Sequence, residues 1–95
     1  MRWSLVLVAF VALGTLSCGR KATREDCEVV VDRNVEVQMK ALGITDPAAI
    51  EKKRQEMHAS MSEDIDKCVG KRVTDAMIAC VKDAPTTDKI DKCFR

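Results

Sequence analysis

The number and spacing of the cysteines constrain this chain most. Five cysteines occur in 95 residues, and four of them, Cys27, Cys68, Cys80 and Cys93, lie in the charged part of the chain. Their separations of 41, 12 and 13 residues include no C-x-x-C and fit neither a zinc ribbon nor a thioredoxin-like motif. Four thiolates around a zinc ion are the alternative. The pattern favours a small domain stapled by two disulfides.

A hydrophobic segment precedes these four cysteines. Arg2 supplies a positive charge, and the uncharged residues 5–16 follow it. As a helix this run would span about 18 Å, whereas a bilayer core needs about 30 Å. The length is typical of a signal peptide, so residues 1–17 are set apart from the fold.

The end of this segment resembles the lipobox of bacterial lipoproteins. Leu16 and the small residue Ser17 stand directly before Cys18, and the one departure is Thr15, where the family most often has leucine. The resemblance implies that Cys18 receives a thioether-linked diacylglycerol and that the chain is cleaved before it. It also implies that the new amino group is acylated, with palmitate as an expected fatty acid. Such an anchor is stable.

The resemblance also bears on location. Gly19 lacks the aspartate that retains well-studied lipoproteins at the inner membrane, so the outer membrane of the cell envelope is favoured. The alternatives are that Cys18 is an ordinary cysteine behind a conventional signal peptide, or part of an uncleaved anchor. Assigning Cys18 to lipid leaves an even number of cysteines for disulfides, which supports the lipoprotein interpretation.

Residues 18–23 would then form a lipid-anchored tether, and residues 24–95 a helical, disulfide-stapled domain. The basic side chains near the tether, Arg20, Lys21 and Arg24, would either contact anionic lipid or form a solvated linker. A domain of this size has a marginal hydrophobic core, and disulfides are the expected remedy.

The periodicity after residue 23 is helical nearly throughout, with no hairpin signal. We expect four helices: residues 24–42 after a capping box at Thr23, 47–69 after Asp46 and Pro47, 73–83, and a short last helix capped by Thr86 or Thr87. The predicted fold class is all-α, a small three- to four-helix bundle of helical hairpins stapled by two disulfides.

Helix geometry ranks the possible disulfide pairings. Cys80 and Cys93 lie symmetrically about the turn at residues 85–87, so an antiparallel hairpin would bring them together. Cys27 at the start of the first helix would lie near Cys68 at the end of the second. We therefore favour Cys27–Cys68 and Cys80–Cys93. The alternatives pair Cys27 with Cys80 or Cys93, because perfect hairpin symmetry would place Cys27 opposite Glu63.

One group of residues suggests a metal site. Met57, His58 and Met61, with Met39 as a further candidate, offer the thioethers and imidazole that suit copper(I). Met57 and Met61 also belong to the apolar stripe of their helix, whereas His58 is rotated away from it, which favours core packing. No metal or other cofactor is therefore expected.

Charge and composition exclude other classes. Without Arg2, fifteen Lys and Arg face fifteen Asp and Glu, and Phe94 is the only aromatic residue after the signal peptide, so nucleic acid is not an expected partner. His58 is the only histidine, and no nucleophile or acid stands at a diagnostic spacing from it, so we expect no enzyme.

The predicted function is therefore that of a small envelope lipoprotein, attached to the membrane by lipid on Cys18. It would act as a structural or protein-interaction module with an envelope protein partner. The second hypothesis is a periplasmic copper- or zinc-binding helical protein that uses Met57, His58 and Met61. The third is a secreted inhibitor or toxin-like peptide released without lipid.

Overall fold

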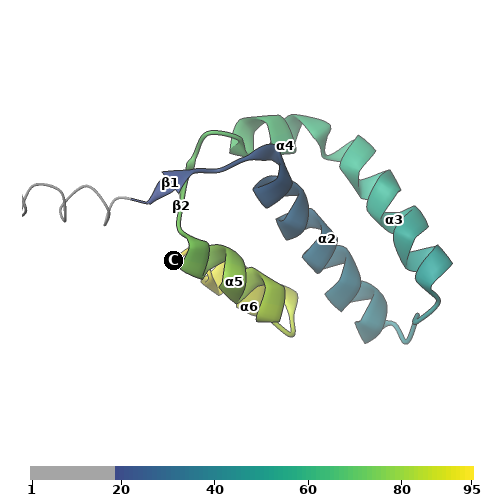
Figure 1. Ribbon diagram of the computed structural model, residues 1–95. Coiled ribbons are helices and arrows are strands. Elements are labelled where there is room, and N and C mark those ends of the chain that lie inside the picture. The colour runs from purple at the N-terminus through teal and green to yellow at the C-terminus, as the bar shows by residue number, and fades with distance from the viewer. Residues whose placement is uncertain (1–18) are drawn as a thin grey trace, which may run out of the picture.

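The computed structural model describes residues 19–95, which form five helices and one small sheet (Figure 1). The predicted signal peptide and Cys18 lie outside the described residues. In chain order the elements are β1 (Arg20–Lys21), α2 (Arg24–Ala41), α3 (Pro47–Ser60), α4 (Ser62–Cys68), β2 (Arg72–Val73), α5 (Asp75–Asp83) and α6 (Thr87–Lys92). The fold is predominantly helical, as predicted, but it has more helices than expected and contains a sheet that was not expected.

Four of the five described helices begin after a side-chain cap. The Thr23 hydroxyl accepts a hydrogen bond from the Asp26 N–H at 3.1 Å, and the Asp26 carboxylate accepts one from the Thr23 N–H at 2.8 Å, which confirms the capping box. Asp46 caps α3, with Pro47 in the first helical position. Threonine hydroxyls cap the two C-terminal helices, Thr74 for α5 and Thr86 for α6.

The prediction of one continuous helix over residues 47–69 is wrong, because the chain bends at Met61. Its φ of −105° and ψ of 18° lie outside the helical region, so α3 ends and α4 begins there. Just before the bend the Ser60 hydroxyl donates to the Met57 carbonyl at 3.3 Å, a side-chain bond that competes with regular helix geometry. The bend turns α4 across the start of α2 (Figure 1), where Ile65 packs against Cys27.

The sheet pairs two segments about fifty residues apart in the chain. β1 runs antiparallel to β2, with Arg20 opposite Val73 and Lys21 opposite Arg72. Val73 therefore belongs to a strand, and the helix predicted from residue 73 begins at Asp75. A ladder of two residues a side has neither an alternating run nor a hairpin turn, which are the signals that reveal strands in a sequence.

Residues assigned to the tether continue this pairing into the domain. The Ala22 N–H donates to the Lys71 carbonyl at 2.7 Å, and the Gly70 N–H donates to the Ala22 carbonyl at 2.8 Å. Ala22 is buried. The folded part of the chain thus begins before residue 24, within the residues assigned to the tether.

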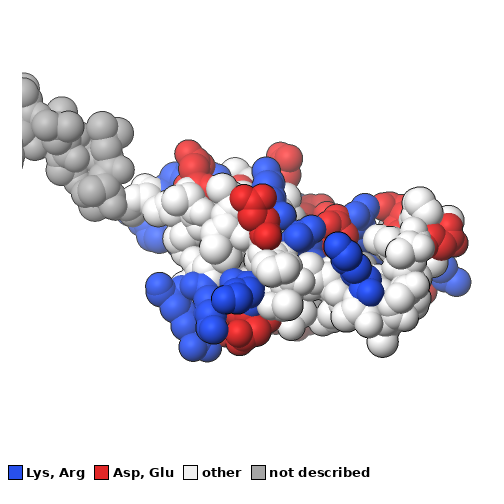
Figure 2. Space-filling view, turned by 90° about the horizontal axis from the view of Figure 1, so that it is seen from below, with Lys and Arg blue, Asp and Glu red and all other residues white. Residues whose placement is uncertain are grey.

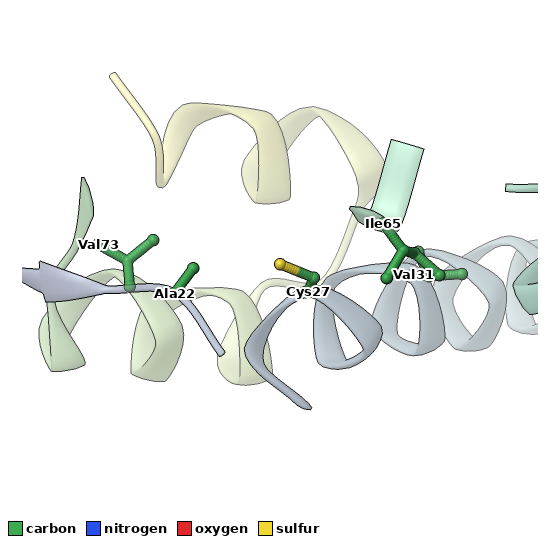
Figure 3. Packing of buried hydrophobic residues seen from close by; sticks show 5 residues of the cluster. All are labelled: Ala22, Cys27, Val31, Ile65 and Val73. Carbon is green, nitrogen blue, oxygen red and sulfur yellow. The ribbon is translucent and has the colours of Figure 1, made fainter. Parts of the chain in front are cut away.

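Helix α2 is the central element, because it contacts each of the other four helices. Two apolar clusters lie along it. The first, shown in Figure 3, joins the strands to α2 and α4, and the second joins α2 to the α5–α6 hairpin. The first cluster consists of Ala22, Cys27, Val31, Ile65 and Val73, and the second of Val37, Val81, Ala84 and Ile90.

Two disulfides close the fold. Cys27 is joined to Cys68, with Cα atoms 6.1 Å apart, and Cys80 is joined to Cys93, with Cα atoms 5.8 Å apart. This is the pairing that helix geometry favours. The first bond ties α4 to the start of α2, and the second ties α5 to the end of α6. Within residues 19–95 no helix combines the length and apolar character needed to cross a bilayer.

Candidate interaction site

The end of the domain that adjoins Cys18 is a ribbon with two different faces. Side chains alternate along a strand, so the cross-strand partners Lys21 and Arg72 share one face, and both are exposed. Ala22 and Val73 lie on the other face and are buried in the first apolar cluster (Figure 3). The outward face of the ribbon is therefore basic.

Gly19 fits tightly against this ribbon. Its φ is +75°, and a Cβ atom placed on it would approach the Val73 carbonyl oxygen to 2.8 Å. Only glycine accepts both the conformation and the close approach. The residue next to Cys18 is thus already packed on the domain.

Two of the three basic residues expected near lipid are engaged in ion pairs. The Arg20 guanidinium donates to the Asp26 carboxylate at 2.6 and 3.1 Å and to Asp75 at 2.8 Å. Arg24 donates to Asp66 on α4 at 2.8 Å. The hydrogen bond from Arg20, followed by that from the Thr23 N–H, holds the pKa of Asp26 well below its usual range. These arginines stabilise the junction of β1, α2, α4 and α5, and only Lys21 keeps its charge free of the ion pairs found here.

An apolar pocket of about 190 Å³ lies behind the ribbon. Ala22 and Val73 line it from the strands, Ile65 from α4, and Phe94 from the C-terminal end. Phe94 is 41% exposed, which makes it one of three exposed large hydrophobic residues in the described part. The C-terminus therefore lies near the same end of the domain as Gly19 (Figure 1).

The residues of the alternative copper hypothesis contact different parts of the domain. Met57 and Met61 pack against the first apolar cluster. His58 instead faces α2, where its Nε2 lies 2.6 Å from the Asp32 carboxylate and its Nδ1 lies 3.6 Å from that of Glu28. Over residues 19–95 no three His, Cys, Asp or Glu side chains are grouped to hold a metal ion.

A second polar contact joins α2 to α3 and to the chain after α5. Glu36 pairs with Arg33 at 3.0 Å and with Arg54 of α3. Arg33 also donates from Nε and Nη2 to the Ala84 carbonyl, at 3.1 and 2.8 Å. Burial acts to lower the pKa of Arg54, but hydrogen bonds and charge from Glu51 and Glu36 outweigh that effect, so the pKa is raised. The buried Nε–H of Arg54 has no hydrogen-bond partner among the described residues.

This polar contact forms one wall of an open cleft of about 850 Å³ between α2, α3 and Pro85. Basic, acidic and apolar side chains share its lining: Arg33, Lys40 and Arg54, Glu36, and Val37, Ile44, Ile50 and Pro85. Sequence reasoning missed this cleft, because its residues form no motif and Pro85 is distant in sequence from residues 33–54. The amphipathic pattern predicts only that α2 and α3 pack together.

Together these features describe a small disulfide-stapled helical domain with a basic ribbon at one end and a mixed cleft towards the other. A scan against protein-family models, a search of curated proteins and a search of solved structures each found no match to this chain.

Proposed function

We propose that this chain is a small lipoprotein of the bacterial cell envelope, anchored by lipid on Cys18 and favouring the outer membrane. Its domain acts by contact, as a structural or protein-interaction module, and we propose no catalytic activity for it. Cysteine use supports the anchor. Of the five cysteines, the four after Cys18 are joined in two disulfides, so the folded chain offers Cys18 no disulfide partner. A thiol in that position is what lipid attachment requires.

The arrangement of the domain supports a role in contact. The fold begins at Gly19, and α2 then carries the chain about 27 Å through its eighteen residues. The open cleft lies along the second half of α2, from Arg33 to Ala41 and beyond. An anchor at one end of α2 therefore leaves the cleft at a distance from the membrane, where it can meet another protein.

The chemistry of the cleft indicates what it would bind. Lys40 is exposed and takes part in none of the ion pairs within residues 19–95, whereas Arg33 and Arg54 are paired with Glu36 on the cleft wall. Ile44 and Ile50 supply apolar surface in the same cleft as Lys40. A peptide segment of an envelope protein that carries a carboxylate next to an apolar side chain fits this combination.

Intact-mass measurement of the native protein tests the anchor. The proposal requires a chain that starts at Cys18, carries acyl groups and has two oxidised cysteine pairs. Cys18→Ser should abolish partitioning into the detergent phase, whereas Ser17→Ala, which keeps a small residue before the cysteine, should preserve it. Unacylated protein in the medium would instead support the secreted-peptide hypothesis.

Site-specific photo-crosslinking in intact cells tests the contact. A photoreactive residue at Ile50 in the cleft should give one discrete product with an envelope protein, and the charge reversal Lys40→Glu should remove it. The same photoreactive residue at the exposed position Asp88 on α6 is the matched control. Equal products from both positions, or none from either, would remove the cleft from the proposal.

A further inference from the structure

We infer that the outward face of the β1–β2 ribbon docks on anionic phospholipid head groups beside the lipid anchor. The docking surface consists of Lys21 and Arg72 on that face, together with the exposed residues Lys71 and Val69 in the segment that leads into β2. This inference rests on the proposed attachment of lipid to Cys18 and adds to it an orientation of the domain on the membrane. The occupant to which we commit is a lipid surface with negatively charged phosphate groups.

The first observation is a like-charge pair. Lys21 and Arg72 are direct cross-strand partners, and both are exposed. Like charges in this position destabilise a sheet. The ion pairs at this end use Arg20 with Asp26 and Asp75, and none within residues 19–95 uses Lys21, Lys71 or Arg72. This repulsion lowers the stability of a short strand pair, and an external anion bound between the two cations would reduce the repulsion.

The second observation is that the neighbouring acids are already engaged. Arg20 forms ion pairs with Asp26 and Asp75, and Arg24 forms one with Asp66. These contacts compensate the positive charge of the two arginines. Lys21 and Arg72, on the outward face of the strand pair, carry charge that no ion pair within residues 19–95 compensates. On the face shown in Figure 2, basic and acidic side chains are interspersed over the right half, whereas several basic side chains gather at the lower left.

The third observation is the position of the surface. Lys21 follows Cys18 by three residues, so their Cα atoms are at most about 11 Å apart. Arg72 lies across the ladder from Lys21, and Lys71 precedes it. The surface is thus within about one Debye length of the proposed lipid attachment, where attraction to a charged membrane is still strong. No flexible spacer separates the two, because Gly19 is packed against Val73.

Exposed apolar side chains accompany the basic ones. Val69 is 42% exposed in the loop that leads to Lys71, and Phe94 is half-exposed at the rim of the pocket behind the ribbon. Two of the three exposed large hydrophobic residues of the described domain therefore lie at the anchored end. Basic residues flanking isolated apolar side chains are suited to the interface between head groups and acyl chains.

The test uses the acylated protein in nanodiscs, with a gadolinium chelate on a fraction of the lipid head groups. In discs with about one third phosphatidylglycerol, the amides of residues 69–72 should show paramagnetic relaxation comparable to that of residues 19–21 beside the anchor and stronger than that of the other surface amides. In discs of phosphatidylcholine alone, or at about 0.5 M NaCl, this relaxation should fall towards that of the other surface amides.

A pair of matched variants isolates the charge. Lys21→Gln with Arg72→Gln should weaken docking roughly 25-fold, about fivefold for each cation removed, and should abolish the difference between the two lipid compositions. Lys52→Gln with Lys82→Gln removes the same charge at exposed positions on α3 and at the end of α5, outside the ribbon and the cleft, and should leave that difference intact. Gln at exposed positions leaves the apolar core unchanged, and the salt comparison on the unaltered protein gives a second measurement.

The outcomes separate the two proposals. Relaxation of residues 69–72 that is the same in both lipids and unaffected by salt overturns the docking inference and leaves the anchor intact. A mass spectrum without acyl groups overturns the anchor. If acylated protein orients on anionic discs but the control pair loses the effect as strongly as the ribbon pair, the attraction is to overall charge and the proposed surface is wrong.

Discussion

The Cα atoms of Cys27 and Cys68 lie 6.1 Å apart because the chain bends at Met61. Perfect hairpin symmetry would place Cys27 opposite Glu63. The bend redirects α4 across the start of α2, so Cys68 reaches Cys27 and Ile65 enters the same cluster. The disulfide and the helix bend therefore both belong to the way in which α3 and α4 pack on α2.

Removal of this bond should cost more than removal of the other. The Cys27–Cys68 bond spans 41 residues of sequence and the Cys80–Cys93 bond spans 13, so by loop entropy they contribute about 4 and about 3 kcal/mol. Urea unfolding of Cys27→Ala with Cys68→Ala, and of Cys80→Ala with Cys93→Ala, measures both losses. A loss below about 1 kcal/mol for either pair would contradict the entropic account.

The capping carboxylate should make stability depend on acid. Because the folded-state pKa of Asp26 is depressed, its contribution is present above the unfolded value of about 3.9 and is lost as the pH falls below it. The melting temperature should drop from pH 5 towards pH 2, and Asp26→Asn should flatten part of that drop. Asp83→Asn, at an exposed carboxylate with no ion pair in the described domain, is the control and should keep the wild-type slope.

Two isoleucines should respond differently to truncation. Ile65 is 4% exposed within the first cluster, so Ile65→Ala should lower the free energy of unfolding by about 2–5 kcal/mol. Ile50 lines the open cleft and is only partly buried, so Ile50→Ala should cost clearly less. Equal losses in chemical denaturation would show that the cleft is part of the core.

The contact between α2 and α3 should show measurable coupling. Glu36 and Arg54 are both partly buried, and a double-mutant cycle with Glu36→Gln and Arg54→Gln should give a coupling energy of about 1 kcal/mol. The exposed pair Asp88 and Lys92 on α6 should give at most about 0.5 kcal/mol by the same method. A coupling no larger than that of the control would mean that Glu36 does not hold the helices together.

Much of the helical fold could be predicted from local signals. Thr23, Asp46 and Thr86 each cap a helix where their sequence context predicts one. The favoured cysteine pairing followed from the spacing of helix ends around short turns. These features depend on a few neighbouring residues or on simple symmetry, which a single sequence displays.

Long-range features could not be predicted in the same way. The pairing of Lys21 with Arg72 joins two segments whose composition resembles a basic linker and the start of a helix. Neither segment contains a signal that it pairs with the other. The cleft beside Arg54 arises only when three segments meet. The sequence periodicity predicts a continuous helix through Met61. The packing of α4 against α2 overrides this local preference, and the chain bends there.

The early position of Cys27 also has a mechanical consequence. Tension applied at Gly19, as from a membrane moving relative to a bound protein, would reach the Cys27–Cys68 bond after unravelling at most residues 19–26. Beyond that point the load passes through covalent bonds into both α2 and α4, and α4 continues directly from α3. A pull at the N-terminal end of the domain therefore meets a covalent loop before most of α2 can unravel.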